Sequence, residues 1–266
     1  MFKKLFAIAN NGLSHLKFRC LSCEHIGIHM NKEHFWPKWL IEKTRTDRTG
    51  VKWVDGKKIP PSRATIPICT RCNNDFGRYL ESPTAKIFDD LENERGISDN
   101  EAELLVRWLW KFEGLHWNIL HPNDRYTRSR TLRNRVLNPI VDIRGDLVLA
   151  ISLIRKMSDP SRDMPLGIDS YNEKSAIFVA GVFSHIAIMV LLKQFENIVP
   201  HFFSKYHLKQ NADTSSEAKL FYPSTGFSDE IQAIGVAKQV SEVLSAAHDQ
   251  FSVKLVTMYG NNAPYA

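Results

Sequence analysis

Four cysteines stand in two close pairs in this 266-residue chain, Cys20-x-x-Cys23 and Cys69-x-x-Cys72. Each pair bends the backbone into a knuckle that presents two thiolates, and two knuckles supply the four ligands of a tetrahedral Zn²⁺ ion. Four unrelated buried thiols would not show this paired spacing. Because four protein ligands leave no open position on the metal, we expect the zinc to be structural. A redox role is the weaker alternative, since neither pair sits in a strand-helix-strand pattern.

Three polar residues lie within this cysteine frame. Glu33 and His34 fall between the two pairs, and Asn73 directly follows the last cysteine. Hydrolysis of a phosphodiester needs an activated water and a cation that neutralises charge on the phosphate. Histidine titrates near neutral pH and suits a general base, while carboxylate and amide oxygens suit Mg²⁺ or Mn²⁺. Asn74 and Asp75 are rivals for the role of Asn73, and Asp75 is the stronger because it is an anion.

The ordered set resembles the HNH nucleases, or ββα-metal endonucleases, in the subset that carries a four-cysteine zinc site. That subset shows Cys-x-x-Cys, then Asp/Glu-His-x-x-Pro, then a second Cys-x-x-Cys followed by Asn or His. Here the match is Glu33-His34-x-x-Pro37 and Asn73 inside the cysteine frame, over residues 17–82. The resemblance implies His34 as general base, Glu33 and Asn73 as ligands of a catalytic Mg²⁺ or Mn²⁺, and a structural Zn²⁺. It also implies a DNA endonuclease, of a kind that often acts in restriction or phage defence.

The chain departs from the pattern of these nucleases in one important place. Their middle Asn, a few residues before the third Cys, fastens the active-site loop, but here the sequence reads Arg63-Ala64-Thr65-Ile66. Thr65 or another group takes over this role, or the loop is held differently. The alternative to an enzyme is therefore a non-catalytic zinc module that binds nucleic acid or a protein partner.

The charge is concentrated in the N-terminal third. Residues 1–80 hold 15 Lys and Arg against 6 Asp and Glu, a net charge of +9, while the whole chain has +6, so residues 81–266 have −3. A basic region of this kind favours nucleic acid as the partner, with DNA expected over RNA. Contacts with phosphates would make binding salt-dependent and largely independent of sequence.

The composition, 43% hydrophobic and 24% charged, is typical of soluble globular proteins and excludes a disordered or collagen-like chain. The apolar run in residues 1–9 is too short for a signal peptide. Residues 176–192 are also apolar, but His185 near the middle favours two buried strands over a membrane helix. We expect a cytoplasmic protein with reduced thiols and no membrane segment.

Hydrophobic periodicity predicts an α+β fold. Together with the resemblance, which implies a zinc-stapled ββα-metal lobe over 1–95, it predicts a second unit, an α+β domain over 96–266. The second unit could recognise a target, bind a partner protein or form a homodimer. In the first unit, we predict a hairpin around the first cysteine pair, a strand leading to the second pair, and a helical segment divided at Pro83. A capping box, Ser98-x-x-Glu101, predicts the start of a helix with a regular apolar stripe. Further strands are predicted at 146–154, 176–183 and 186–192, and a helix at 229–251.

Five arginines, at positions 125, 128, 130, 133 and 135, follow that helix. Their spacing spreads them around several faces of a helix, which predicts a solvated surface, with a phosphate-binding patch as the alternative.

Overall fold

The computed structural model describes residues 19–26, 29–48, 50–52, 58–120, 131–155, 166–170, 178–211 and 220–246. The N-terminal run 1–9 and the arginines at 125, 128 and 130 lie outside these ranges. Within them the chain is a mixture of helices and strands, which confirms the predicted α+β class. No helix in the described ranges is both long and apolar enough to cross a membrane.

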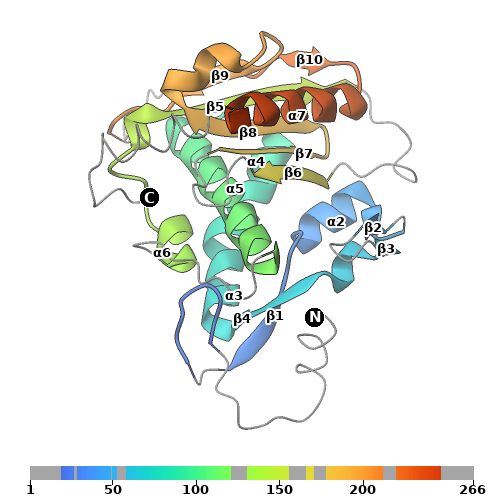
Figure 1. Ribbon diagram of the computed structural model, residues 1–266, viewed down its shortest axis with the longest axis vertical. Helices are drawn as coiled ribbons and strands as arrows, with labels where there is room; N and C mark the ends of the chain where they lie inside the picture. Colours follow the sequence, from blue (N-terminus) through green and yellow to red (C-terminus); the bar gives the residue numbers. More distant parts are fainter. Residues whose placement is uncertain are drawn as a thin grey trace.

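Two antiparallel strands and a helix form the cysteine-bearing end of the molecule (Figure 1). Strand β1 (Met30–His34) pairs with β4 (Thr65–Cys69), and helix α3 (Thr70–Phe76) follows β4 directly. The register places Met30 opposite Cys69 and His34 opposite Thr65. The segment between the two strands contains α2 (Lys38–Thr44), β2 (Val51–Lys52) and β3 (Lys58–Ile59).

The helical segment after the second cysteine pair changes its hydrogen-bond pattern just before Pro83, while Glu81 and Ser82 keep right-handed helical backbone angles, so the predicted division is not a break in the helical backbone. Helix α3 passes into a π-helical turn, Gly77–Glu81, and then into α4 (Ser82–Glu92). Pro83 lies in the first turn of α4, where a missing N–H interrupts the helical hydrogen bonds least. The π turn brings Glu81 to a buried position that matters for the polar site described below.

Helix α5 (Asp99–Leu120) runs through the middle of the molecule, between the cysteine-bearing end and the large sheet (Figure 1). It begins at the predicted capping box: the Ser98 N–H donates to Glu101 Oε2 at 2.8 Å, and the Glu101 N–H donates to Ser98 Oγ at 3.4 Å. Its apolar stripe is buried, with Trp108 and Phe112 fully enclosed. Helix α5 contacts both α4 and the large sheet, so it joins the two ends of the fold.

The large sheet has the strand order β10-β5-β8-β7-β6, and β9 also pairs with β5. Its strands are β5 (Leu147–Ile154), β6 (Leu166–Ser170), β7 (Val179–Phe183), β8 (Ile186–Leu192), β9 (Ser204–His207) and β10 (Thr225–Phe227). Every residue of β5, β7 and β8 is buried, so both faces of the sheet are covered. Helices α5 and α7 (Glu230–Ala246) both pack against β7 and β8. The two strands predicted within 176–192 are confirmed.

One hydrophobic core runs through the described part of the chain. The buried cluster extends from Cys20 to Leu244 and includes the cysteine-bearing end, the apolar stripe of α5 and the central strands of the large sheet. It contains residues from both sides of position 95, where the two predicted units meet. The division into 1–95 and 96–266 stays a prediction, and the two parts share one core.

Candidate metal centre and adjacent polar site

The four cysteines meet in one cluster. The sulfur atoms of Cys20, Cys23, Cys69 and Cys72 all lie within 4.8 Å of one another, and those of Cys23 and Cys69 are 3.8 Å apart. A tetrahedral Zn²⁺ with Zn–S bonds of about 2.3 Å separates its sulfurs by about 3.8 Å. The four-cysteine group can therefore hold a metal ion such as zinc, as the spacing predicts.

Backbone hydrogen bonds shape both knuckles around the sulfurs. In the first knuckle, the Cys20 N–H donates to His25 O and the Glu24 N–H donates to Cys20 O, both at 2.9 Å. In the second, Cys69 caps α3, and its sulfur accepts from the Cys72 N–H at 3.4 Å. The Cys69 N–H donates to the sulfur of Cys20 at 3.2 Å and ties the knuckles together. The predicted hairpin is present as a turn closed by a bridge between Arg19 and Ile26.

Hydrogen bonding and burial shift the pKa values of the cysteine thiols in different directions. The Cys72 thiol donates to the sulfur of Cys20, and together with backbone N–H groups it lowers the pKa of Cys20 well below that of an ordinary thiol, although burial opposes this. The thiolate is the form that binds metal. The same hydrogen bond raises the pKa of Cys72, and burial raises that of Cys23, so these contacts favour the thiolate at Cys20 and not across the whole cluster.

Arg133 of helix α6 (Leu132–Leu137) fastens the cysteine cluster from outside. Its Nη1 donates to the sulfur of Cys72 at 3.5 Å, its Nη2 pairs with Asp75, and its backbone N–H donates to Ser22 O at 3.0 Å. One residue thus contacts both knuckles. Sequence reasoning missed this role, because Arg133 is 61 positions from Cys72 and no spacing rule connects them.

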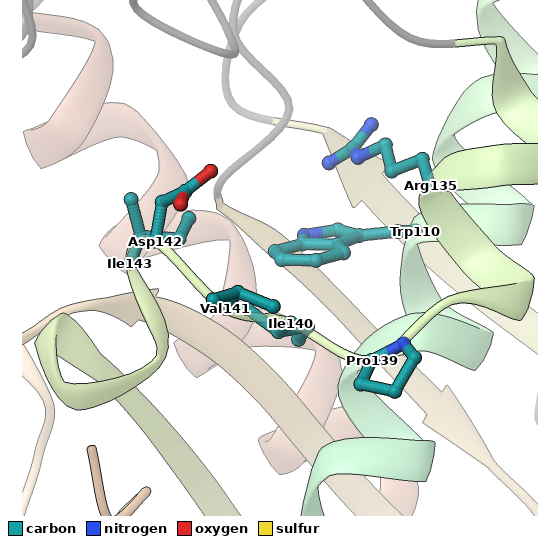
Figure 2. A pocket seen from close by; sticks show the side chains of 7 residues that line it. All are labelled: Trp110, Arg135, Pro139, Ile140, Val141, Asp142 and Ile143. Atoms are coloured by element: carbon teal, nitrogen blue, oxygen red, sulfur yellow. The ribbon is translucent and has the colours of Figure 1, made fainter. Parts of the chain in front are cut away.

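Arg135 is buried, so the prediction of a solvated surface fails for this residue. Its guanidinium pairs with Glu113 at 3.0 Å and lies 4.5 Å above the centre of the Trp110 ring. Figure 2 shows this stack beside a pocket that the loop 139–143 also lines. The pocket has a volume of about 10 Å³, which accommodates one water molecule at most. Arg135 therefore has a packing role, and the pocket is too small for a ligand.

The predicted polar site brings Glu33 and Asn73 together. The Nδ2 of Asn73 donates to Glu33 Oε2 at 2.8 Å and to Lys32 O at 3.4 Å. Because Asn73 follows Cys72 on α3, the cysteine cluster fixes the position of this amide relative to β1. Asp75, the predicted rival, does not share this site, since its carboxylate pairs with Arg133.

His34 ends strand β1, one residue after Glu33, and its side chain is half-buried. Among the described residues, no hydrogen bond joins it to Glu33 or to Asn73. Neighbouring residues of a regular strand face opposite sides, which separates the side chains of Glu33 and His34 at this point. His34 instead lies within electrostatic range of Asp47, whose pKa is lowered chiefly by hydrogen bonds from Ser62 and to a smaller extent by this histidine.

The segment around His34 is held by contacts other than a middle Asn. Asp47 Oδ1 accepts from the Ser62 N–H at 3.0 Å, which ties the turn after α2 to the turn before β4. The Phe35 N–H donates to Ala64 O at 2.8 Å and continues the pairing of β1 with β4. Neither of these contacts involves the side chain of Thr65.

A fully buried lysine contacts Glu33 from helix α5. The ammonium of Lys111 pairs with the carboxylates of both Glu33 and Glu81, and its own side chain is 1% exposed. Burial acts to lower the pKa of Lys111, but the two carboxylates outweigh it and raise that pKa above its ordinary value. Sequence reasoning missed Lys111, although it falls three residues after Trp108 and thus on the buried side of α5.

Glu81 is the most heavily bonded member of this group. Its Oε2 accepts from the indole N–H groups of Trp39 at 3.0 Å and Trp108 at 3.1 Å, while its Oε1 pairs with Lys111. We call Glu33, Lys111 and Glu81 the buried charge cluster. It connects strand β1, the π turn and helix α5 by charged contacts.

Comparison with known proteins finds no family model, no curated protein and no solved structure that matches this chain. Its function must therefore be inferred from the residues of the site.

Proposed function

We propose that this chain is a metal-dependent endonuclease that hydrolyses phosphodiester bonds of nucleic acid, with DNA the expected substrate. The contact of 2.8 Å between Asn73 and Glu33 supports this proposal most directly. It joins the acid on β1 to the amide on α3, the two positions that the resemblance to HNH nucleases marks as metal ligands. Strand β1 pairs with β4 and helix α3 follows β4, which is the strand-strand-helix arrangement of a ββα-metal lobe, with α2, β2 and β3 inserted between the two strands.

In this proposal the four-cysteine cluster holds a structural Zn²⁺ and acts as a staple. Cys69 ends β4 and Cys72 lies in the first turn of α3, so a bound ion would lock the strand to the helix that carries Asn73. The first knuckle, at Cys20 and Cys23, would be locked to the same ion. A lobe with few core residues gains order from such a metal.

The donors of the polar site fit a Mg²⁺ or Mn²⁺ ion by their chemistry. Glu33 Oε2 accepts one hydrogen bond, which leaves a lone pair on that oxygen. Asn73 offers its amide oxygen to a cation after its side-chain amide rotates by half a turn. The nitrogen and the oxygen of an amide have nearly the same shape and are distinguished by their hydrogen bonds. Such an ion, when bound, stabilises the charge that develops on the phosphate.

The residues of the chain then have separate tasks. His34, half-buried at the end of β1, accepts the proton of the attacking water. Glu33 and Asn73 hold the cation, and basic residues of the N-terminal third bind the phosphate backbone. Because one such site cuts one strand, a double-strand break needs two sites, which a homodimer would supply.

A non-catalytic zinc module that binds nucleic acid or a protein is the second candidate. Two observations favour it: Lys111 already pairs with Glu33, and no hydrogen bond among the described residues links His34 to the Glu33–Asn73 pair. Such a module would keep the cysteine cluster and shift nucleic acid on a gel without cutting it.

Cleavage of supercoiled plasmid in Mg²⁺ or Mn²⁺ separates the two candidates. We expect the wild type to nick the plasmid and His34→Ala to be at least about a hundredfold slower, the usual range for loss of a general base. His29→Ala is the matched control, because it removes an exposed histidine just before β1 and should cut normally. Zinc content must be equal in all three proteins.

Two results would count against the enzyme. If His34→Ala cuts as fast as the wild type, His34 is not the base. If all three proteins hold zinc and shift DNA but none cuts, the zinc-module candidate replaces the nuclease.

A further inference from the structure

The buried charge cluster holds one cation between two anions. The side chain of Lys111 is 1% exposed, and those of Glu33 and Glu81 are 10% and 11% exposed. Water therefore screens these charges poorly, and each charge acts strongly on the others. The net charge of the cluster is −1, since two carboxylates outnumber one ammonium.

This balance depends on Glu81. With Glu33 alone as its partner, Lys111 would cancel the charge of the carboxylate that our proposed function assigns to a divalent cation. Our proposed function does not use Glu81 as a ligand: its Oε2 accepts from the Trp39 and Trp108 indoles, and its Oε1 pairs with Lys111. Its position is fixed by these two indole hydrogen bonds.

We infer that Glu81 is a positioning residue that balances the charge of Lys111, so that Glu33 keeps the negative charge needed to bind a divalent cation. The inference rests on the proposed function, in which Glu33 is a metal ligand. Lys111 in turn holds the Glu33 side chain in place from α5. The cation affinity of the polar site is thereby set by two residues that do not touch the cation.

The inference predicts effects on metal binding that follow charge rather than packing. Glu81→Gln makes the cluster neutral and should weaken Mn²⁺ binding by roughly tenfold or more, since a missing unit charge acts on a divalent ion through a poorly screened interior. Adding Lys111→Met to Glu81→Gln returns the net charge to −1 and should bring Mn²⁺ affinity back near the wild-type value. A purely structural role predicts that the second substitution adds to the damage.

Glu113→Gln is the matched control. Glu113 is a buried carboxylate on the same helix, two residues from Lys111, and it pairs with Arg135 at 3.0 Å. This substitution also removes one buried negative charge, but from α5 and from a different ion pair. Mn²⁺ affinity should stay within about threefold of the wild type, because the Glu33 carboxylate keeps its own partners.

The test titrates Mn²⁺ into the zinc-loaded full-length protein and follows free Mn²⁺ by electron paramagnetic resonance. Glu33→Gln marks the site, and circular dichroism with zinc analysis checks the fold of each variant. We expect a site that Glu33→Gln removes, that Glu81→Gln weakens and that the double variant restores.

Other results overturn the inference or the function beneath it. A wild type without any Mn²⁺ site that depends on Glu33 overturns the proposed function itself. A wild-type site that Glu81→Gln leaves unchanged overturns only the role of Glu81. If Glu81→Gln does not fold, the double variant decides: near wild-type affinity supports charge balance, and a loss of tenfold or more refutes it.

Discussion

Arg133→Met tests whether helix α6 stabilises metal bound in the cysteine cluster. Methionine keeps an apolar stem of similar length but removes the charge and the donor that lies 3.5 Å from the sulfur of Cys72. The backbone bond from residue 133 to Ser22 O remains, so the variant isolates the guanidinium. Four thiolates around one Zn²⁺ carry a net charge of −2, and a cation touching one sulfur offsets part of it.

The expected loss can be estimated from this contact. A hydrogen bond with a charged partner contributes about 1.5–3 kcal/mol, which is roughly a 10- to 150-fold change in an equilibrium constant. Loss of a group that supports a metal ligand weakens metal affinity by about 10- to 100-fold. The bond to Cys72 is long, so we expect a value near tenfold. Competition with a chromophoric zinc chelator measures this change directly.

Arg71→Met is the matched control for this experiment. Arg71 lies on α3, its side chain is 84% exposed, and it approaches the same Asp75 carboxylate at 3.9 Å. The substitution Arg71→Met removes the same charge from the surroundings of Asp75. None of the described contacts links Arg71 to a cysteine sulfur. We expect unchanged zinc affinity in Arg71→Met. Equal affinities in Arg133→Met and the wild type, or equal losses in the two variants, would refute the proposed support of Cys72.

Two further predictions concern the buried network at the start of α5, where Arg144 pairs with Asp99 and Glu103. Arg144→Met should lower the free energy of unfolding by about 3–5 kcal/mol in urea titrations, because it removes the guanidinium that pairs with two buried carboxylates, of which Glu103 keeps an ion pair with Arg107. Arg95→Met, which removes an exposed partner of a surface pair, should cost less than about 1 kcal/mol. Burial acts to raise the pKa of Asp99, but hydrogen bonds from Arg144 and Tyr206 outweigh it and hold that pKa below its ordinary value of 3.8. The ionised Asp99 therefore stabilises the fold above about pH 4, and this contribution is lost as pH falls through the folded-state pKa. Between about pH 5 and pH 3, the free energy of unfolding of Asp99→Asn should fall less than that of the wild type. An equal fall in the two proteins would contradict the stabilising role of ionised Asp99.

Local patterns predicted many of the helices and strands and the grouping of the four cysteines. The apolar stripe of α5, its capping box and the two strands within 176–192 depend on short-range periodicity, which the sequence displays directly. The cysteine cluster was predictable for a similar reason. Each Cys-x-x-Cys pair is a short local motif, and the two pairs together supply four ligands for one ion. The contact of Asn73 with Glu33 follows from the same frame.

Contacts between distant segments could not be predicted in the same way. The spacing of the arginines predicts a solvated position for Arg133, because its partners Cys72 and Ser22 come from segments that only the fold brings near. Lys111 did carry a signal, since it occupies a core-facing position of α5. A charged residue on an apolar stripe indicates a buried partner but does not identify it, and here the partners are 78 and 30 residues away.

The part of the chain beyond residue 95 completes the site that the N-terminal motif begins. Lys111 supplies the only described cation in hydrogen-bond contact with Glu33, and Arg133 supplies the guanidinium that contacts Cys72. Without them, two carboxylates of the N-terminal part would be buried without a counter-charge, and Cys72 would lose a donor to its sulfur. The cysteine cluster and the Glu33–Asn73 pair therefore come from the N-terminal motif but depend on α5 and α6 for cationic partners. This dependence explains why a motif confined to a quarter of the sequence lies in a core that extends through the whole described fold.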